Sequence, residues 1–171
     1  MRVSIFKQIS NPILFKQQLL QWAQQFREAV FMDSNEYPQE YSNFDCVLAV
    51  DAFTSVKTDY FNAFEDLHQY QSHTKDWLFG YLSYDLKNDT EALTSRNFDG
   101  LEFPDLYFFQ PKKLFFLKGN QVELHYLKLC DDELDGDFEE IGRGEKEVWS
   151  LESREGSQIK IQQRISKESY I

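Results

Sequence analysis

The sequence predicts an α/β domain of the α+β kind, with a mostly antiparallel sheet and helices on the outer face of that sheet. Aromatic residues make up 16% of the 171 residues and gather in short apolar runs that suit strands. Between these runs, apolar residues recur at helical spacing. A two-residue Gly119-Asn120 turn between apolar runs adds a hairpin, the connection typical of antiparallel strands.

The most aromatic part of the chain lies within residues 76–109. It begins with D-W-L-F-G-Y-L-S-Y-D at 76–85 and ends with L-E-F-P-D-L-Y-F-F at 101–109. Since residues 77–84 leave no polar face, we expect a central strand that is buried on both sides. Gly80 inside this strand indicates the close approach of another backbone or of a ring.

The chain before this stretch predicts a strand at residues 2–9, followed by a helix. Asn11 suits the N-cap of that helix and Pro12 suits its first turn. The inner face of the helix is a stripe of apolar residues at helical spacing: Phe15, Leu19, Trp22 and Phe26. This stripe is expected to lie on the sheet.

Further strands and a loop follow this helix. Residues 29–32 predict a short strand, residues 33–43 a polar loop and residues 46–50 a third strand, with which residues 53–57 pair. A second helix is expected next, capped by Thr58 or Asp59. Its expected inner face consists of Tyr60, Phe64 and Leu67.

The remaining elements are a short helix, a strand, the hairpin and a C-terminal region. Residues 87–93 predict about two helical turns and residues 106–109 a strand. Residues 114–118 and 121–129 form the two arms of the hairpin. The C-terminal expectations are a solvated acidic segment at 131–140, a helix at 138–151, a strand around Ile159, Ile161 and Ile165, and a helix that begins at Ser166.

Composition narrows the class of protein. A chain of 171 residues suits one domain with a sizeable core, and its net charge of −11 argues against binding nucleic acid. No apolar run approaches the roughly 20 residues that a membrane helix needs, and no secretory signal is present. We therefore expect a cytoplasmic protein in which Cys46 and Cys130 are reduced core thiols.

No motif in the chain predicts a catalytic or metal site. Residues 131–142 have the glycine of a calcium loop at the sixth place, but Glu133 occupies the third place and Gly142 the twelfth, where a bidentate glutamate is needed. His68, His73 and His125 have no partner at metal-ligand spacing. Phosphate loops and readable nucleophile–base pairs are absent from the sequence.

Four segments, taken in order, carry a resemblance to a known family. They are F-M-D-S at 31–34, Y-S-N-F-D-C-V-L-A at 41–49, G-Y-L-S-Y-D at 80–85 and F-P-D-L-Y-F-F at 103–109. Together they resemble the N-terminal half of the chorismate-utilising synthases that work with an amidotransferase. This family comprises component I of aminodeoxychorismate (para-aminobenzoate) synthase and component I of anthranilate synthase.

The resemblance also suggests how the chain is divided. The closing R-I-S-K-E-S-Y-I at 164–171 is similar to the start of the family's chorismate-binding half. It implies an N-terminal region at 1–165 and the first turn of the second half at 166–171, so that this chain is one half of the family's two-sheet fold. A frayed chain end is the alternative explanation of residues 166–171.

What the resemblance implies about function is amination of chorismate with glutamine-derived ammonia. The Phe44-Asp45 pair favours the aminodeoxychorismate branch, while Asp33-Ser34 partly matches the anthranilate branch. The implied partners are the missing chorismate-binding half, with its Mg²⁺ and catalytic residues, and a glutamine amidotransferase subunit. Two alternatives are a non-catalytic module that binds an aromatic amino acid and an interaction domain with an accidental resemblance.

The resemblance further implies a tryptophan-type pocket. Its expected residues are Met32, Ser34, Tyr41, Ser42 and Phe44. The apolar side chains would wall a slot for the indole, and the hydroxyls would bond the polar groups of the ligand. Asp33 is left out because strand alternation points it away from Ser34. Alternatively, Tyr41 and Ser42 only start the next strand, and Ser34 bonds the loop backbone.

Overall fold

The fold is α+β with a mostly antiparallel sheet, as the sequence predicts. The computed structural model describes residues 1–35, 37, 41, 43–91, 93 and 100–144. This part of the chain contains a six-stranded sheet of order β1-β6-β5-β3-β2, with β4 paired to β5, and four α-helices. The elements in chain order are β1 (Arg2–Gln8), α1 (Pro12–Ala23), β2 (Ala29–Asp33), β3 (Cys46–Thr58), α2 (Ala63–Thr74), β4 (Phe79–Leu82), the 3₁₀ turn η1 (Tyr84–Leu86), α3 (Lys87–Glu91), β5 (Leu106–Lys118), β6 (Gln121–Leu127), the 3₁₀ turn η2 (Lys128–Glu133) and α4 (Leu134–Arg143).

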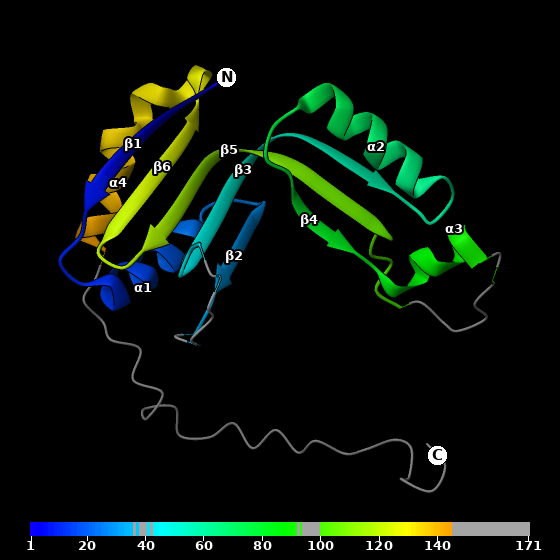
Figure 1. Ribbon diagram of the computed structural model, residues 1–171, viewed down its shortest axis with the longest axis horizontal. Helices are drawn as coiled ribbons and strands as arrows, with labels where there is room; N and C mark the ends of the chain where they lie inside the picture. The colour runs from blue at the N-terminus through cyan, green and yellow to red at the C-terminus, as the bar shows by residue number, and fades with distance from the viewer. Residues whose placement is uncertain (36, 38–40, 42, 92, 94–99, 145–171) are drawn as a thin grey trace, which may run out of the picture.

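Two long strands, β3 and β5, run through the whole sheet. They bend midway and join one half, with β1, β6, β2, α1 and α4, to another half with β4, α2 and α3 (Figure 1). The register of the pair shifts between Ala52 and Thr54, and Asp51 beside the shift has φ of 60°. Pro111 pairs with Ala52 there, where a missing N–H is tolerated. The prediction of separate strands at 46–50 and 53–57, and at 106–109 and 114–118, was therefore wrong.

Local sequence accounts well for the first helix and for the hairpin. The Asn11 side chain accepts a hydrogen bond from the Leu14 N–H at 3.0 Å, and Pro12 opens α1, so the predicted cap is confirmed. Lys118 pairs with Gln121 across the predicted two-residue turn. Gly119 has φ of +54° in that turn, a conformation that glycine adopts without steric cost.

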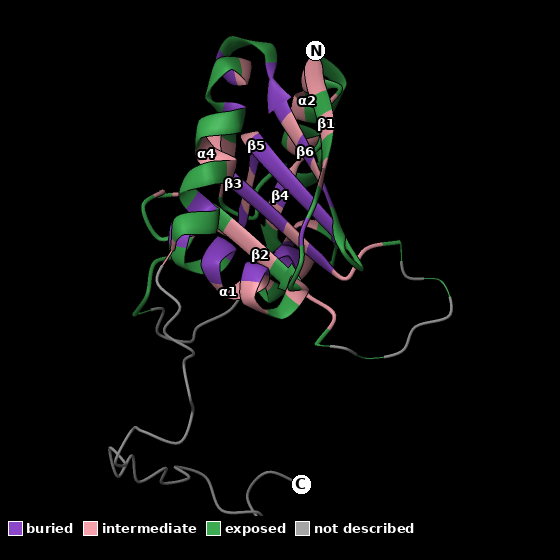
Figure 2. Ribbon diagram, turned by 90° about the vertical axis from the view of Figure 1, so that its left-hand side faces the viewer, coloured by how far each residue is buried: buried purple, intermediate pink, exposed green. Residues whose placement is uncertain are grey.

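The larger core lies between the sheet and the pair of helices α1 and α4. It contains the predicted helix residues Phe15, Leu19 and Trp22, together with Phe115 and Tyr126 of the sheet. The Trp22 ring meets the Phe115 ring edge-on, with 5.5 Å between centroids. Figure 2 shows β5 mostly buried and β3 buried mainly in its first part, while the outward side of α4 is exposed. In this half, both helices therefore pack on one face of the sheet.

A second core cluster is formed by buried residues of the strands alone. Its buried members are Ala49, Phe79, Phe109, Leu114 and Phe116. Within the described part of the chain, no helix contributes a residue to this cluster, which is therefore called the helix-free cluster below. The curvature of the sheet therefore lets strands bury these side chains against one another.

The strand predicted at 77–84 is shorter and less buried than expected. β4 covers only Phe79–Leu82, and among the described strands it pairs with β5 alone. Trp77, Tyr81 and Leu82 are all exposed, so the prediction of burial on both sides was wrong. The Gly80 prediction fits, because a Cβ on this residue would lie 1.9 Å from the Tyr107 carbonyl oxygen.

The second helix also differs from its prediction. α2 begins after Asn62, whose φ of 54° interrupts the helical pattern, and Asp59 bonds the Phe61 N–H before the helix starts. Tyr60 and Phe64 are exposed, so they do not form the inner face. Leu67 faces the sheet as predicted, and Ala63 joins it in a small cluster with Leu86 and Leu106.

The acidic segment at 131–140 is not simply solvated, contrary to its prediction. Most of it forms η2 and α4, and Leu134 is buried against the core. Asp137 of this helix lies 2.6 Å from the buried Lys113 ammonium and accepts a hydrogen bond from the Tyr126 hydroxyl. The expected helix at 138–151 corresponds to α4 as far as Arg143, and the elements expected beyond residue 144 lie outside the described residues.

Arg2 holds the bend of the sheet together. Its buried guanidinium bonds the Asp76 carboxylate at 2.8 Å and the carbonyl oxygens of Pro111, Lys112 and His125. These groups belong to the α2–β4 connection, β5 and β6, so one side chain ties the two halves of the sheet to β1. Burial of Asp76 opposes its charge, but hydrogen bonds from Arg2, Gln110 and the Trp77 N–H together outweigh burial and lower the pKa of this carboxyl.

Candidate functional site

The residues predicted to form a tryptophan-type pocket lie around the end of β2. Met32 pairs with Val47 of β3 and is half exposed. Ser34 follows β2, and its backbone N–H donates to the Asp45 carbonyl at 2.9 Å. The Ser34 carbonyl in turn accepts from the Tyr37 N–H at 3.0 Å.

Phe44 approaches this region from the segment that precedes β3. Its ring contacts the Phe116 ring at 4.7 Å between centroids and packs against the helix-free cluster. Because Asp45 bonds Ser34, the structure places Phe44 beside the end of β2, and Met32 lies in the same strand pair. Tyr41 is 87% exposed, and Ser42 lies outside the described residues. No described pocket is lined by these residues together.

Asp33 points away from this group, as strand alternation predicts. Its carboxylate forms an ion pair of 2.7 Å with Lys16 of α1, on the helix-covered side of the sheet. It also accepts a hydrogen bond from the Asn35 N–H. Since Asp33 is engaged there, it does not face a ligand that contacts Met32.

The thiols of the chain lie in the core and are not poised for reaction. Cys46 and Cys130 are both free and buried, as predicted. Burial raises the pKa of the Cys46 thiol to about 12, and the nearby Asp33 carboxylate acts in the same direction. Among the residues that the structure describes, no three His, Cys, Asp or Glu side chains are grouped to hold a metal ion.

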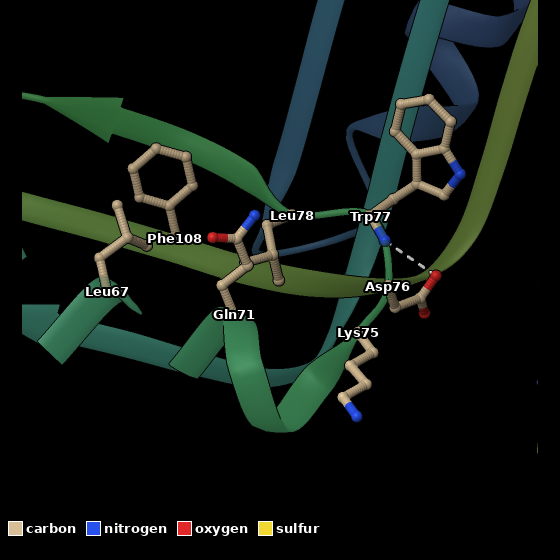
Figure 3. Close-up of a pocket in the computed structure, with 7 residues that line it drawn as sticks. All are labelled: Leu67, Gln71, Lys75, Asp76, Trp77, Leu78 and Phe108. Carbon is tan, nitrogen blue, oxygen red and sulfur yellow. Dashed lines mark hydrogen bonds between the residues drawn. The ribbon is translucent and has the colours of Figure 1, made fainter. Parts of the chain in front are cut away.

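One pocket of about 620 Å³ lies between α2 and the start of β4 (Figure 3). Leu67, Gln71 and Phe108 lie together at one end of it, and the Trp77 ring points away from them. Asp76 supplies a carboxylate, but this group already bonds Arg2 and the Trp77 N–H. The pocket therefore combines an apolar wall with a carboxylate that is held in place by its own neighbours.

A second pocket of about 640 Å³, here called the β2–β4 pocket, lies where the two halves of the sheet meet. Aromatic side chains from β4 and β5 dominate it. The Tyr81 and Tyr107 rings meet edge-on at 6.2 Å, and the Tyr107 and Phe109 rings stack at 6.0 Å. The residues that line it are Arg27, Glu28, Ala29, Val30, Phe31, Lys57, Gly80, Tyr81, Phe103, Pro104, Tyr107 and Phe109.

The β2–β4 pocket was not predicted from the sequence. Tyr81, Tyr107 and Phe109 fall in segments that sequence patterns assign to strand cores, and Lys57 resembles an ordinary surface lysine. Only the register of β4 and β3 on β5 brings them together, with Tyr81 opposite Tyr107 and Lys57 opposite the same Tyr107. One local pattern does bear on the position of Lys57. Val56 packs on the side of the sheet that α2 covers, so strand alternation directs the neighbouring Lys57 to the opposite face.

Comparisons with known proteins add no family to this description. A scan against protein-family models finds no match for the chain, and a search of curated proteins finds no relative. None of the helices in the described part of the chain is long and apolar enough to span a membrane.

Proposed function

We propose that this chain is the N-terminal region of component I of an aminodeoxychorismate synthase, which aminates chorismate to 4-amino-4-deoxychorismate on the route to 4-aminobenzoate and folate. The observation that supports this best is where the four resembling segments fall. They end β2 (31–34), lead into β3 (41–49), run through β4 (80–85) and lead into β5 (103–109). Since β2 pairs with β3, β3 with β5 and β5 with β4, segments distant in sequence form one continuous part of the sheet.

The distribution of helices on the sheet is compatible with one half of a two-sheet synthase. α1 and α4 cover one face, and the cluster around Phe109 and Phe116 has no helix over it in the described part of the chain. Under this proposal α1 and α4 form the outer layer, and the second cluster faces a second sheet. The chorismate-binding half then carries the Mg²⁺ site and the catalytic residues, and a glutamine amidotransferase subunit supplies ammonia.

Chorismate turnover tests the proposal. The 171-residue chain alone is expected to leave chorismate, ammonia and Mg²⁺ unchanged, since the proposal assigns the catalytic residues to the chorismate-binding half and no group of metal ligands occurs among the described residues. The product of the complete reading frame is expected to form 4-amino-4-deoxychorismate under the same conditions, measured by chromatography. Anthranilate as the product would assign the other branch, and a complete protein that consumes no chorismate would refute the proposal.

The tryptophan-type pocket is part of the same proposal and has its own test. Each hydroxyl–ligand hydrogen bond contributes roughly 0.5–1.5 kcal/mol, so Ser34→Ala is expected to weaken tryptophan binding severalfold. Ser72→Ala on the exposed surface of α2 is the matched control, because its hydroxyl bonds only the His68 carbonyl of its own helix. Calorimetry on the complete protein measures both variants. Absence of heat with millimolar tryptophan would exclude the pocket.

A further inference from the structure

The walls of the β2–β4 pocket suit a flat aromatic group. Its volume of about 640 Å³ lies within the range of small-molecule sites in proteins. Tyr107 stacks against Phe109 on one side and meets Tyr81 edge-on at the other, so three rings surround part of the space. Aromatic pairs favour stacked and edge-on contacts at these separations, and a planar ligand can extend the same arrangement.

Lys57 gives this pocket an uncompensated positive charge. Its ammonium lies 4.6 Å from the centroid of the Tyr107 ring, which holds the charge against the aromatic wall. None of the described carboxylates forms an ion pair with Lys57, although the chain has 29 acidic and 18 basic residues. In so acidic a protein, a lysine without an acidic partner in an aromatic pocket is available to an external anion.

The other charges of the pocket do not change this balance. Arg27 and Glu28 lie side by side, with 3.5 Å between Nε and Oε1, and offset each other. Burial of Tyr107, together with the Glu28 charge, raises the pKa of the phenol, so its hydroxyl stays neutral and can donate a hydrogen bond. A cationic ligand is disfavoured, because the Lys57 ammonium already lies over the face of the Tyr107 ring that a cation would bind.

We propose that the β2–β4 pocket binds a planar aromatic molecule with one negatively charged group, its ring among Tyr81, Tyr107 and Phe109 and its anion at Lys57. An aromatic carboxylate is the simplest member of this class. The pocket shares none of the residues of the tryptophan-type region around Met32 and Ser34. The inference does not rest on the proposed function, and either can fail without the other.

Three probes of equal size and different charge test the inference on the 171-residue chain. They are 2-naphthoate, 2-naphthamide and 2-naphthylmethylammonium, titrated by NMR or calorimetry. A charge-assisted hydrogen bond to Lys57 is expected to make naphthoate bind roughly tenfold more tightly than the amide, with the ammonium probe weakest. Equal dissociation constants for the three probes, or no binding at millimolar concentration, would overturn the proposal.

Variants locate the site. Lys57→Gln is expected to remove the preference for naphthoate over naphthamide and to leave the amide unchanged, because only the charge is lost. Lys128→Gln, at an exposed lysine of η2 far along the chain, is the matched control and should retain the preference. Tyr81→Ala should weaken all three probes, and Ser34→Ala should weaken none. An unchanged preference in Lys57→Gln, in a variant with normal circular dichroism, would place the anion elsewhere and refute the assignment.

Discussion

Replacing Lys113 with methionine removes a buried positive charge from between the sheet and α4. The Lys113 side chain is 4% exposed, and its ammonium lies 2.6 Å from both Asp137 and Glu133. It is also within 5.6 Å of the ring centroids of Trp22, Phe26 and Tyr126. The ammonium is thus enclosed by two carboxylates and three rings, which makes it the most completely enclosed cation described here.

The expected cost follows from what the substitution leaves behind. Methionine fills similar space, but Asp137 keeps a charge at 15% exposure without its partner. Breaking a buried pair in this way costs about 3–5 kcal/mol. Because Asp137 keeps the Tyr126 hydrogen bond and Glu133 can turn to water, we expect about 3 kcal/mol. With a urea m-value of about 1–3 kcal/mol/M, the unfolding midpoint should fall by about 1–3 M.

Urea denaturation followed by circular dichroism measures the loss, and two further variants test its cause. Lys113→Met with Asp137→Asn removes the unpaired charge and keeps an acceptor for Tyr126, so it should recover part of the stability. Lys112→Met, in the half-exposed pair with Asp51, should cost less than about 1 kcal/mol. If Lys113→Met costs no more than Lys112→Met, or if the double variant is no more stable than the single one, the reasoning is refuted.

The same cluster predicts a dependence on alkaline pH. Burial opposes the charge on Lys113, but the hydrogen bonds to Asp137 and Glu133 outweigh burial and raise the pKa of its ammonium. A group with a raised pKa in the folded state stabilises the fold fully below its unfolded pKa of about 10.4. That contribution is lost as the pH rises through the folded pKa. Wild type should therefore lose more stability than Lys113→Met above pH of about 10.4.

Three further predictions concern packing, acid stability and the helix-free cluster. Gly80→Ala should cost at least about 1–3 kcal/mol of folding stability, because its Cβ would meet the Tyr107 carbonyl oxygen at 1.9 Å. Gly136→Ala has open space around its Cβ and should be neutral or stabilising. Thermal melting that ranks the two variants equally would contradict this. Asp76 has a lowered pKa, so its contribution to folding stability is present above its unfolded pKa of about 3.9 and is lost as the pH falls through the folded pKa. Asp76→Asn should therefore reduce stability at pH 7 and lose less further stability on acidification than wild type. Urea titration at several pH values measures both effects. If the helix-free cluster faces a second sheet, the isolated chain should bind a hydrophobic dye or self-associate, and both effects should disappear when the chorismate-binding half is supplied. A chain that binds no dye and elutes as a monomer in size-exclusion chromatography would argue against this second sheet.

Local signals in the sequence were enough for elements whose ends are set by neighbouring residues. The Asn11 cap, Pro12 and the apolar stripe of α1 act within one helix, so their pattern predicts its start and its buried face. The turn at Gly119 likewise depends on two residues and fixes the register of the hairpin. Strand alternation also sufficed to separate Asp33 from Ser34.

Pairing between distant segments decided what the sequence alone left uncertain or misplaced. Pro111 and the two lysines after it resemble a break between strands, yet β3 supports β5 across this point and makes one strand of two predicted ones. Residues 77–84 look uniformly buried because aromatic composition does not reveal which strand lies at an edge. β4 has one described neighbour, so Tyr81 and Leu82 stay exposed.

By itself, then, the sequence determined the α+β class, the first helix, the hairpin and the reduced state of the buried thiols, because each depends on composition or on contacts within a few residues. Tertiary structure alone decided that Asp137 is enclosed with Lys113, although its segment looks solvated. It also brought Lys57 over the Tyr107 ring, which meets the Tyr81 ring edge-on. Charges and rings from separate strands meet only where the register of a bent sheet superimposes them, and no local pattern encodes that register.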